Sequence, residues 1–244
     1  MGVERTVVVS GAGSGIGLAV ARRFAQGGDA LVLVGRRPER LDAALKTLPH
    51  GRSVAVAADL SDPAGAERVR AAVAAQGHDR IDVVVACAGA VTRATPVTLA
   101  DVADVWRADF RANVLTAVLL VQALRERLTR PGARVVAVSS IAAFRGGGDS
   151  YSAAKAALVG WVRSLALELG PEGIGVNAVA PGYVAGTEFF GDRMTPARHE
   201  RLVARTALRR PGTPEEVAAV VWALADPAAA YVTGAVVRVD GGAI

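Results

Sequence analysis

The stretch Thr6-Val-Val-Val-Ser10-Gly-Ala-Gly-Ser-Gly-Ile-Gly17 decides the fold of this chain. Its first five residues are a β-branched run typical of a buried parallel strand. After the glycines, Leu18 to Gln26 repeats apolar residues at helical spacing. A strand, a glycine-rich turn and a helix form a phosphate cradle, because glycines let the backbone approach a pyrophosphate and the helix N-terminus offers free N–H groups. The sequence therefore predicts a nucleotide site at its start.

The glycine spacing narrows the kind of turn. The pattern G-x-G-x-x-G does not fit, because Ile16 stands at its sixth position, whereas G-x-x-x-G-x-G fits Gly11, Gly15 and Gly17, with Ser14 between them. A glycine cluster alone is also compatible with a plain tight turn. The flanking strand and helix favour the nucleotide interpretation.

The residues after the second predicted strand, Ala30 to Val34, indicate which dinucleotide binds. An acidic residue at this point bonds the ribose 2′-hydroxyl, whereas an arginine accommodates a 2′-phosphate. This chain has Arg36 and Arg37 there and no carboxylate before Glu39. We therefore expect NADP(H) in preference to NAD(H); the alternative is that the two arginines only begin a solvated helix.

Strand patterns alternate with helical patterns to the end of the chain. We expect a single domain over residues 1–244, an α/β Rossmann-type doubly wound sheet of about seven parallel strands with helices on both faces. The segment 187–210 is charged and lacks strand signals, and is a candidate lid. The remaining predicted strands are 54–57, 81–86, 134–138, 176–180 and 236–239, and the main predicted helices are one opened by Asp62-Pro63, two within 99–128 that meet near 109–112, one over 150–169 capped by Ser150, and one over 214–224 opened by Thr213.

Ligands of such sheets bind at the carboxyl ends of the strands. Several conspicuous segments follow strand ends and should therefore meet at one edge: Gly11 to Gly17, Asp59-Leu60, Cys87-Ala88-Gly89, Ser139-Ser140 and Pro181-Gly182. The carboxylate of Asp59 and backbone groups beside it are placed to meet an adenine.

Tyr151 and Lys155 carry the chemistry that we expect. On a helix, residues four apart share a face. A nearby positive charge lowers the pKa of a phenol, so the pair can act as a general acid. The chain contains only two lysines among its 28 basic residues, which argues against chance at position 155. The alternative is a tyrosine packed in the core beside a solvated lysine.

Composition excludes several other classes of function. The net charge is +5, but the arginines are interleaved with acidic residues along the whole chain, so we expect no nucleic-acid partner. One cysteine, Cys87, and three scattered histidines (His50, His78 and His199) offer no metal-ligand spacing. We also expect no membrane span and no signal peptide, and hence a cytoplasmic protein.

Taken together, these motifs resemble the short-chain dehydrogenase/reductase family, and within it the 3-oxoacyl-carrier-protein reductase type of ketoreductase, over essentially the full length. The resemblance rests on Ser10 to Gly17, Asp59-Leu60, Ala88-Gly89, Asn113, a Ser-Ser pair before Tyr-Ser-Ala-Ala-Lys, Pro181-Gly182 and Val239 to Gly242. It implies a catalytic tetrad of Asn113, Ser140, Tyr151 and Lys155, and a homotetramer. It also implies cofactor contacts from Gly11, Ser14, Gly15, Ile16, Gly17, Arg36, Arg37, Asp59, Leu60, Ala88, Gly89, Tyr151, Lys155, Pro181, Gly182, Val184 and Thr187.

The chain departs from the family pattern at three places. Cys87 and its neighbour Ala86 replace a pair of asparagines that often brace the loop after the fourth strand. Val138 stands where the family serine usually does, so we assign that role to Ser140 across a shortened loop, with Ser139 as the alternative. Glu172 replaces a basic residue that carrier-protein reductases often carry, which weakens the case for an acyl-carrier substrate.

The resemblance implies that Tyr151 gives a proton to a carbonyl oxygen while the carbonyl carbon takes a hydride, or the reverse for a secondary alcohol. The expected pocket residues are Ile141, Phe144, Arg145, Tyr183, Phe189 and Phe190, which suit an apolar or aromatic ketone with an anionic or polar end; a thioester is a further candidate. Arginines of the lid (Arg193, Arg198, Arg201 and Arg205) could steer an acidic carrier or form a solvated helix face. The competing functions are a non-catalytic nucleotide-binding sensor or scaffold, and a dehydratase or epimerase on the same fold.

Overall fold

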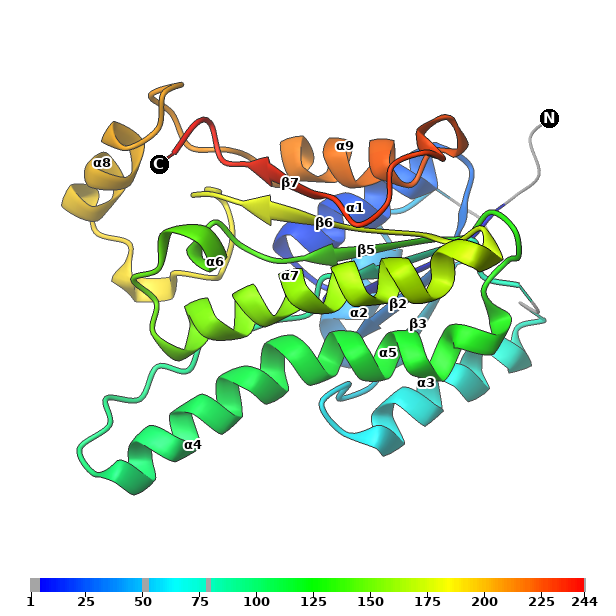
Figure 1. Ribbon diagram of the computed structural model, residues 1–244, viewed down its shortest axis with the longest axis horizontal. Helices are drawn as coiled ribbons and strands as arrows, with labels where there is room; N and C mark the ends of the chain where they lie inside the picture. Colours follow the sequence, from blue (N-terminus) through cyan, green and yellow to red (C-terminus); the bar gives the residue numbers. More distant parts are fainter. Residues whose placement is uncertain (1–4, 50–52, 78–79, 244) are drawn as a thin grey trace.

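The chain folds around one parallel β-sheet (Figure 1). The computed structural model describes residues 5–49, 53–77 and 80–243, and in them the strand order is β3-β2-β1-β4-β5-β6-β7. This confirms the predicted doubly wound sheet of seven parallel strands. The strands are β1 (Thr6–Ser10), β2 (Ala30–Gly35), β3 (Val54–Ala57), β4 (Val83–Ala86), β5 (Arg134–Val138), β6 (Gly175–Pro181) and β7 (Val236–Val239).

Helices cover both faces of the sheet, and alternation along the strands explains why. Successive side chains of a strand point to opposite faces. In β1, Val8 joins one hydrophobic core, while Val7 and Val9 join the other. The core of Val8 is closed by α3 (Pro63–Ala75), α5 (Thr116–Leu124) and α7 (Ser150–Leu169), and the core of Val7 and Val9 by α1 (Gly15–Gln26), α2 (Pro38–Leu45) and α9 (Pro214–Leu224).

Sequence reasoning located most elements within a residue or two. Two differences concern short helices. The helix α2 begins at Pro38 with Arg37 as its N-cap, as in the alternative in which the two arginines begin a solvated helix, and α6 (Ala142–Arg145) forms where we had placed no helix. A third concerns β4, which begins at Val83 because Ile81 pairs with Leu128 only as an isolated bridge. The predicted start of α9 is confirmed, since Thr213 and Glu216 form a reciprocal capping box.

The predicted junction near 109–112 is a π-helical turn. The helix α4 (Leu99–Phe110) runs into α5 through Arg111–Leu115, which forms wider π-type hydrogen bonds. Asn113 lies in the middle of this turn and is fully buried. The buried side chain of Asn113 makes polar contacts there, since its Nδ2 donates hydrogen bonds to Ala90 O and Asp109 O.

The prediction that Ser150 caps α7 is wrong. Asp149 occupies the N-cap position, and Ser150 is the first helical residue. A cap must accept a hydrogen bond from the backbone, but the Ser150 hydroxyl instead donates to the buried carboxylate of Asp109 at 2.7 Å.

The candidate lid lies at the carboxyl edge of the sheet. It contains no strand among the described residues and carries a short 3-10 turn, Gly191–Arg193, and the helix α8 (Pro196–Ala204). In Figure 1, the arrows of β6 and β7 point toward the side of the molecule where α6 and α8 lie. The carboxyl edge of the sheet, where we expect ligands to bind, is therefore bordered by these two helices.

Two of the properties that we do not expect, a membrane span and a metal site, can be compared with the described residues. No described helix is both long enough and apolar enough to cross a membrane. No three described His, Cys, Asp or Glu side chains gather as metal ligands would, and His50 and His78 lie outside the described residues.

We predict that Phe24→Ala weakens the fold far more than a change elsewhere on α1. Phe24 is fully buried in the core between α1 and the sheet, and removing such a ring typically costs about 3–5 kcal/mol of unfolding free energy. Urea denaturation measures the loss. The exposed Gln26→Ala on the same helix is the control, expected within about 0.5 kcal/mol of the parent protein. Equal losses in both variants would contradict this account of the core.

Candidate active site

The glycine turn after β1 is built for close backbone approach. Gly11 and Gly15 have positive φ angles of 68° and 51°. A Cβ at Gly17 would lie 2.2 Å from the carbonyl oxygen of Gly11, so any larger residue would break the turn. Ser14, the N-cap residue of α1, makes no side-chain capping hydrogen bond. The first N–H groups of α1 therefore face the turn without a side-chain partner from their own cap.

A serine hydroxyl braces the two strand ends at the switch point of the sheet. Ser10 Oγ accepts hydrogen bonds from the backbone N–H groups of Cys87 and Ala88, both at 3.0 Å, and donates to Val85 O at 3.4 Å. It replaces the side-chain bonds that Ala86 and Cys87 cannot make. The sequence indicates Ser10 only as part of the glycine motif, and no sequence pattern predicts its contact with Cys87 and Ala88.

The two arginines after β2 have different surroundings. Arg37 lies 3.2 Å from the carboxylate of Glu188 in the candidate lid, and Arg40 holds the other oxygen of that carboxylate at 2.8 Å. Arg36 is exposed and has no carboxylate within ion-pair distance in the described part of the chain, although its charge acts on Asp59. Arg36 is thus the cation left available at this strand end.

Of the Asp59-Leu60 pair, only Asp59 contributes a polar side chain. Its Oδ1 accepts hydrogen bonds from Ser61 N at 3.0 Å and from Ser61 Oγ at 2.8 Å. These bonds, helped by the charge of Arg36, hold the pKa of Asp59 below its ordinary value. The side chain of Leu60 is buried in a core, so only its backbone can meet a ligand.

The segment after β6 returns to the glycine turn. Gly182 N donates to Val239 O at 3.0 Å, and Val184 is buried. Thr187 donates to Val184 O, and its methyl group would lie 3.4 Å from a Cβ added at Gly15. Pro181, Gly182, Val184 and Thr187 therefore follow one path along the edge of the sheet to the glycine turn.

Lys155 is buried at the end of β5. Its side chain is 4% exposed, and its Nζ donates to Val138 O at 2.9 Å and lies 5.8 Å from the centroid of the Tyr151 ring. Ser139 is also committed to α7, since its hydroxyl donates to the carbonyl of Lys155 at 2.8 Å. Ser140, in contrast, interacts with the phenol of Tyr151 and lowers its pKa. Of the two serines, Ser140 is the one beside the phenol.

Asn113 lies against the same site from the other side. Its Nδ2 donates to Ala90 O at 2.6 Å and to Asp109 O at 2.9 Å, while its Oδ1 is buried without a partner among the described residues. A Cβ at Gly89 would lie 2.7 Å from this Oδ1 and 3.1 Å from Lys155 Nζ. Only glycine at position 89 lets Asn113 and Lys155 approach each other, which sequence reasoning did not foresee.

Burial is the main cause of the pKa shifts of Lys155 and Tyr151. It lowers the pKa of Lys155 to about 8, against the pull of Cys87. It also raises the pKa of Tyr151 to about 12, although the hydrogen bond with Ser140 acts in the opposite direction. The expectation that Lys155 brings the phenol pKa down is therefore not met, because loss of hydration outweighs an ammonium that is itself desolvated and bonded to Val138.

Aromatic side chains of the candidate lid line one side of the site. Phe189 packs on Tyr151 with ring centroids 5.4 Å apart, and Phe190 packs edge-on against both Phe189 and Tyr183. The Tyr183 hydroxyl is 2.7 Å from His199 Nδ1 on α8. Of the other expected pocket residues, Ile141 is buried, and Phe144 and Arg145 are exposed on α6 with no described contact to the phenol.

The arginines of the candidate lid are mostly solvated. Arg193, Arg201 and Arg205 are exposed. Arg198 is half-buried, and its guanidinium lies 5.1 Å from the centroid of the Phe190 ring. Three of the four thus form the solvated face that was one of the two expectations.

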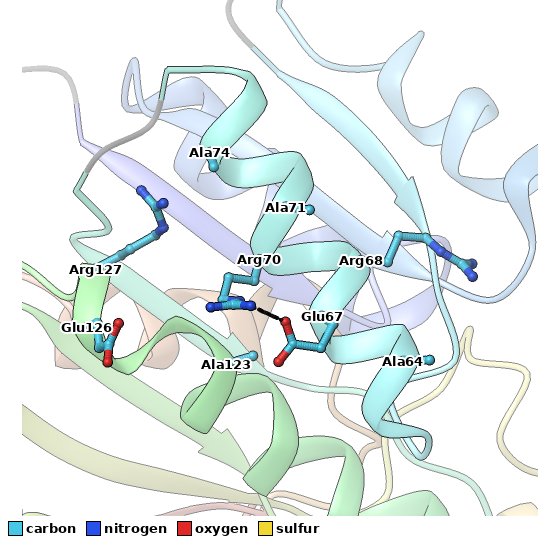
Figure 2. A pocket seen from close by; sticks show the side chains of 9 residues that line it. All are labelled: Ala64, Glu67, Arg68, Arg70, Ala71, Ala74, Ala123, Glu126 and Arg127. Atoms are coloured by element: carbon cyan, nitrogen blue, oxygen red, sulfur yellow. Dashed lines mark hydrogen bonds and ion pairs between the residues drawn. The ribbon is translucent and has the colours of Figure 1, made fainter.

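A hollow elsewhere on the surface is unrelated to the site around Tyr151 and Lys155. It lies between α3 and residues 123–127, and four alanines, three arginines and two glutamates line it (Figure 2). Glu67 and Arg70 form an ion pair across the nearest turn of α3. None of the predicted site residues lines this hollow.

Comparison with known proteins agrees with this geometry. Residues 11–243 match the model of a protein family described as enoyl-(acyl carrier protein) reductase. The chain is similar to short-chain reductase protein NovJ of Streptomyces niveus, with 36% identity over 250 residues covering 98% of this chain and 94% of that protein. It is also similar to cis-4-hydroxycyclohexanecarboxylate dehydrogenase of Sinomonas cyclohexanicum, with 38% identity over 245 residues covering 98% and 96% of the two chains.

A solved structure extends the likeness to three dimensions. The crystal structure of a short-chain dehydrogenase/reductase from Brucella melitensis, described as a glucose/ribitol dehydrogenase, superposes with a TM-score of 0.89 at 33% identity, covering 98% of this chain and 96% of that one. The glycine turn, the tyrosine–lysine pair with its buried lysine and these matches over nearly the whole length agree. The chain belongs to the short-chain dehydrogenase/reductase family.

Proposed function

We propose that this protein is an oxidoreductase that reduces a ketone, or oxidises a secondary alcohol, with NADP(H) as cofactor. The observation that carries the proposal is the buried site in which Ser140 and Lys155 flank the phenol of Tyr151. The residues present fit a dinucleotide, because the glycine turn accepts no Cβ at Gly17 and Arg36 is left without a carboxylate partner in the described structure. A bound reduced nicotinamide would supply the hydride.

Tyr151 is proposed as the general acid. With its pKa raised to about 12, the phenol keeps its proton at neutral pH and can donate it to a carbonyl oxygen. The same protonation state is the wrong one for removing a proton from an alcohol. The free protein is therefore better prepared for reduction than for oxidation.

The other three residues are proposed to support the phenol. Ser140 is proposed to orient a carbonyl oxygen by hydrogen bonding, because its hydroxyl interacts with the phenol. Lys155, with its pKa near 8, holds an exchangeable proton within the buried site. The unpartnered Oδ1 of Asn113 is a suitable acceptor for a water molecule beside Lys155, and Gly89 leaves room for their approach.

The aromatic wall supports a flat, apolar substrate. Phe189 packs on the ring of Tyr151 and is 37% exposed, so part of its surface remains accessible to a ligand. A relative named for a hydroxycyclohexanecarboxylate acts on an alcohol borne by an apolar ring. We propose a ketone on an apolar or aromatic ring as the substrate class, ahead of an acyl thioester.

Self-association is proposed through the helices α4, α5 and α7. Large apolar side chains are exposed on and between these helices, among them Trp106, Leu115 and Leu167, the last of which is 82% exposed. Exposed apolar groups on neighbouring helices are suited to cover each other in an oligomer. This supports the homotetramer that the family resemblance implies.

We predict that Tyr151→Phe folds and binds NADPH but loses about 10²–10⁴-fold in turnover, because the proton donor is gone. The measurement is the decrease of NADPH absorbance with a panel of cyclic and aromatic ketones, together with single-turnover hydride transfer. Tyr231→Phe, at a fully exposed tyrosine, is the matched control and should retain full turnover. Near-normal single-turnover transfer in Tyr151→Phe would overturn the assignment. Consumption of no NADPH by the parent protein would favour a sensor, dehydratase or epimerase.

We predict that Arg36→Ala weakens NADPH binding about 10- to 100-fold and leaves NADH binding nearly unchanged, because a charge-assisted bond to the 2′-phosphate is lost. Titration calorimetry with both cofactors measures this. Arg37→Ala is the comparison: its guanidinium is engaged by Glu188, so its loss should matter less. Equal weakening toward NADPH and NADH, or tighter binding of NADH by the parent protein, would contradict the cofactor preference.

We predict that Lys155→Met abolishes turnover yet stabilises the fold at neutral pH. A pKa lowered from 10.5 to about 8 in the folded state corresponds to about 3 kcal/mol. The unfolded chain binds more protons than the folded one between these values, so the cost is complete below pH 8 and disappears as pH rises to 10.5. Loss of the bond to Val138 reduces the gain by about 1 kcal/mol. Denaturation at pH 7 and pH 10 should show a gain that shrinks with pH; a gain independent of pH would refute the explanation.

A further inference from the structure

Asp109 is a buried carboxylate next to the site that the proposed mechanism does not use. It is 1% exposed, and no Lys or Arg of the described structure lies within ion-pair distance of it. Both of its oxygens accept hydrogen bonds, Oδ1 from Thr92 N and Oδ2 from Ser150 Oγ, each at 2.7 Å. Burying a carboxylate without a cation is costly even when it is hydrogen-bonded, which points to a purpose at this position.

The three segments that Asp109 joins are those that carry the site. Thr92 belongs to the loop after β4, which follows Gly89. Ser150 opens α7, directly before Tyr151. The main-chain carbonyl of Asp109 accepts from Asn113 Nδ2 at 2.9 Å, so the same residue also fixes the amide in the π-helical turn.

The start of α7 has no side-chain cap of its own. Its N-cap residue, Asp149, has a φ of 46° and makes no side-chain capping bond. Gly146 and Gly147, just before it, also have positive φ angles, and nothing in the described structure lies within 4 Å of a Cβ added at either. The bond between Ser150 and Asp109 is therefore the buried side-chain anchor of the turn that presents Tyr151.

We propose that Asp109 is a positioning residue that anchors the first turn of α7 through Ser150 and places a buried negative charge next to the turn that presents Tyr151. The inference rests on the proposed role of Tyr151 as the general acid. It requires that the carboxylate act on the phenol both through geometry and through charge, and the two effects respond differently to substitution.

The pKa of Tyr151 depends on the charged and polar groups that face its phenol. Asp109 on α4 and Cys87 after β4 both raise the pKa of Tyr151, while the hydrogen bond with Ser140 lowers it. Lys155 on α7, at 5.8 Å from the ring centroid, is the cation nearby. Removing the charge of Asp109 should therefore lower the phenol pKa, whereas removing the Ser150 hydroxyl should not.

The test uses four variants of the full chain. Asp109→Asn keeps the shape and can still bond both partners, with the amide nitrogen donating to Ser150 Oγ, but it has no charge. Ser150→Ala removes the anchor and keeps the charge, and Asp109→Ala removes both. Asp104→Asn, at an exposed aspartate of the same helix, is the control for charge.

Two measurements separate the effects. The first is the titration of tyrosine followed by the 13C shift of Cζ in labelled protein; the chain has three tyrosines, and Tyr151→Phe identifies the relevant signal. The second is kcat and KM over a range of pH for ketone reduction. The first does not depend on activity, so it tests the inference even if the ketone panel reveals no turnover and the proposed function fails.

We expect the Tyr151 titration to move to lower pH in Asp109→Asn and to stay in place in Ser150→Ala and Asp104→Asn. We expect kcat to fall about 100-fold in Ser150→Ala, with KM for NADPH unchanged, because a displacement of about 1 Å in the phenol has this effect. If Asp109→Ala does not fold, the other variants decide. An unmoved Tyr151 titration in Asp109→Asn, or a normal kcat in Ser150→Ala, would overturn the proposal.

Discussion

The loss of water around Lys155 and Tyr151 is the constraint on which the rest of the site depends. Both side chains are carried by α7, with Lys155 buried and Tyr151 partly exposed, and desolvation moves the pKa of the lysine down and that of the phenol up. Each shift favours the neutral form, because an uncompensated charge is costly away from water. In the proposed mechanism, the phenol then holds a proton and the lysine exchanges one. The neighbouring carbonyl and hydroxyl groups interact with the lysine and the phenol and are themselves uncharged.

The parallel sheet supplies the place for this chemistry. Strands β1 and β4 are neighbours at the switch point, and their following turns diverge to opposite faces. Ser10 joins these turns through the backbone of Cys87 and Ala88, and Gly89 then leaves room for Asn113 and Lys155. A single hydroxyl and the absence of one Cβ thus connect the nucleotide cradle to the proposed proton-transfer site. The π-helical turn completes the arrangement, because its extra width brings the Asn113 side chain inward.

Much of the fold could be predicted because its signals are local. The runs of Val and Ala in β1, β4 and β5 are apolar on both faces, as central parallel strands must be, and Thr213 with Glu216 marks a helix start within four residues. The prediction failed where a local signal had a distant competitor. Ser150 is a residue type that often caps helices, but a carboxylate 41 positions earlier in the chain accepts its hydrogen bond. Likewise, the phenol–ammonium spacing predicted a lowered pKa, and burial reversed it.

The sequence by itself determined the family, the parallel sheet and the residues gathered at its carboxyl edge, because strand periodicity, glycine spacing and the Tyr-x-x-x-Lys motif are written in short segments. Only the tertiary structure decided which serine stands beside the phenol, which arginine stays free of Glu188, and how strongly burial shifts the two pKa values. It also revealed Asp109 as the link between the loop after β4 and the start of α7. These properties depend on desolvation and on contacts between segments far apart in the chain, and neither quantity exists until the chain is packed.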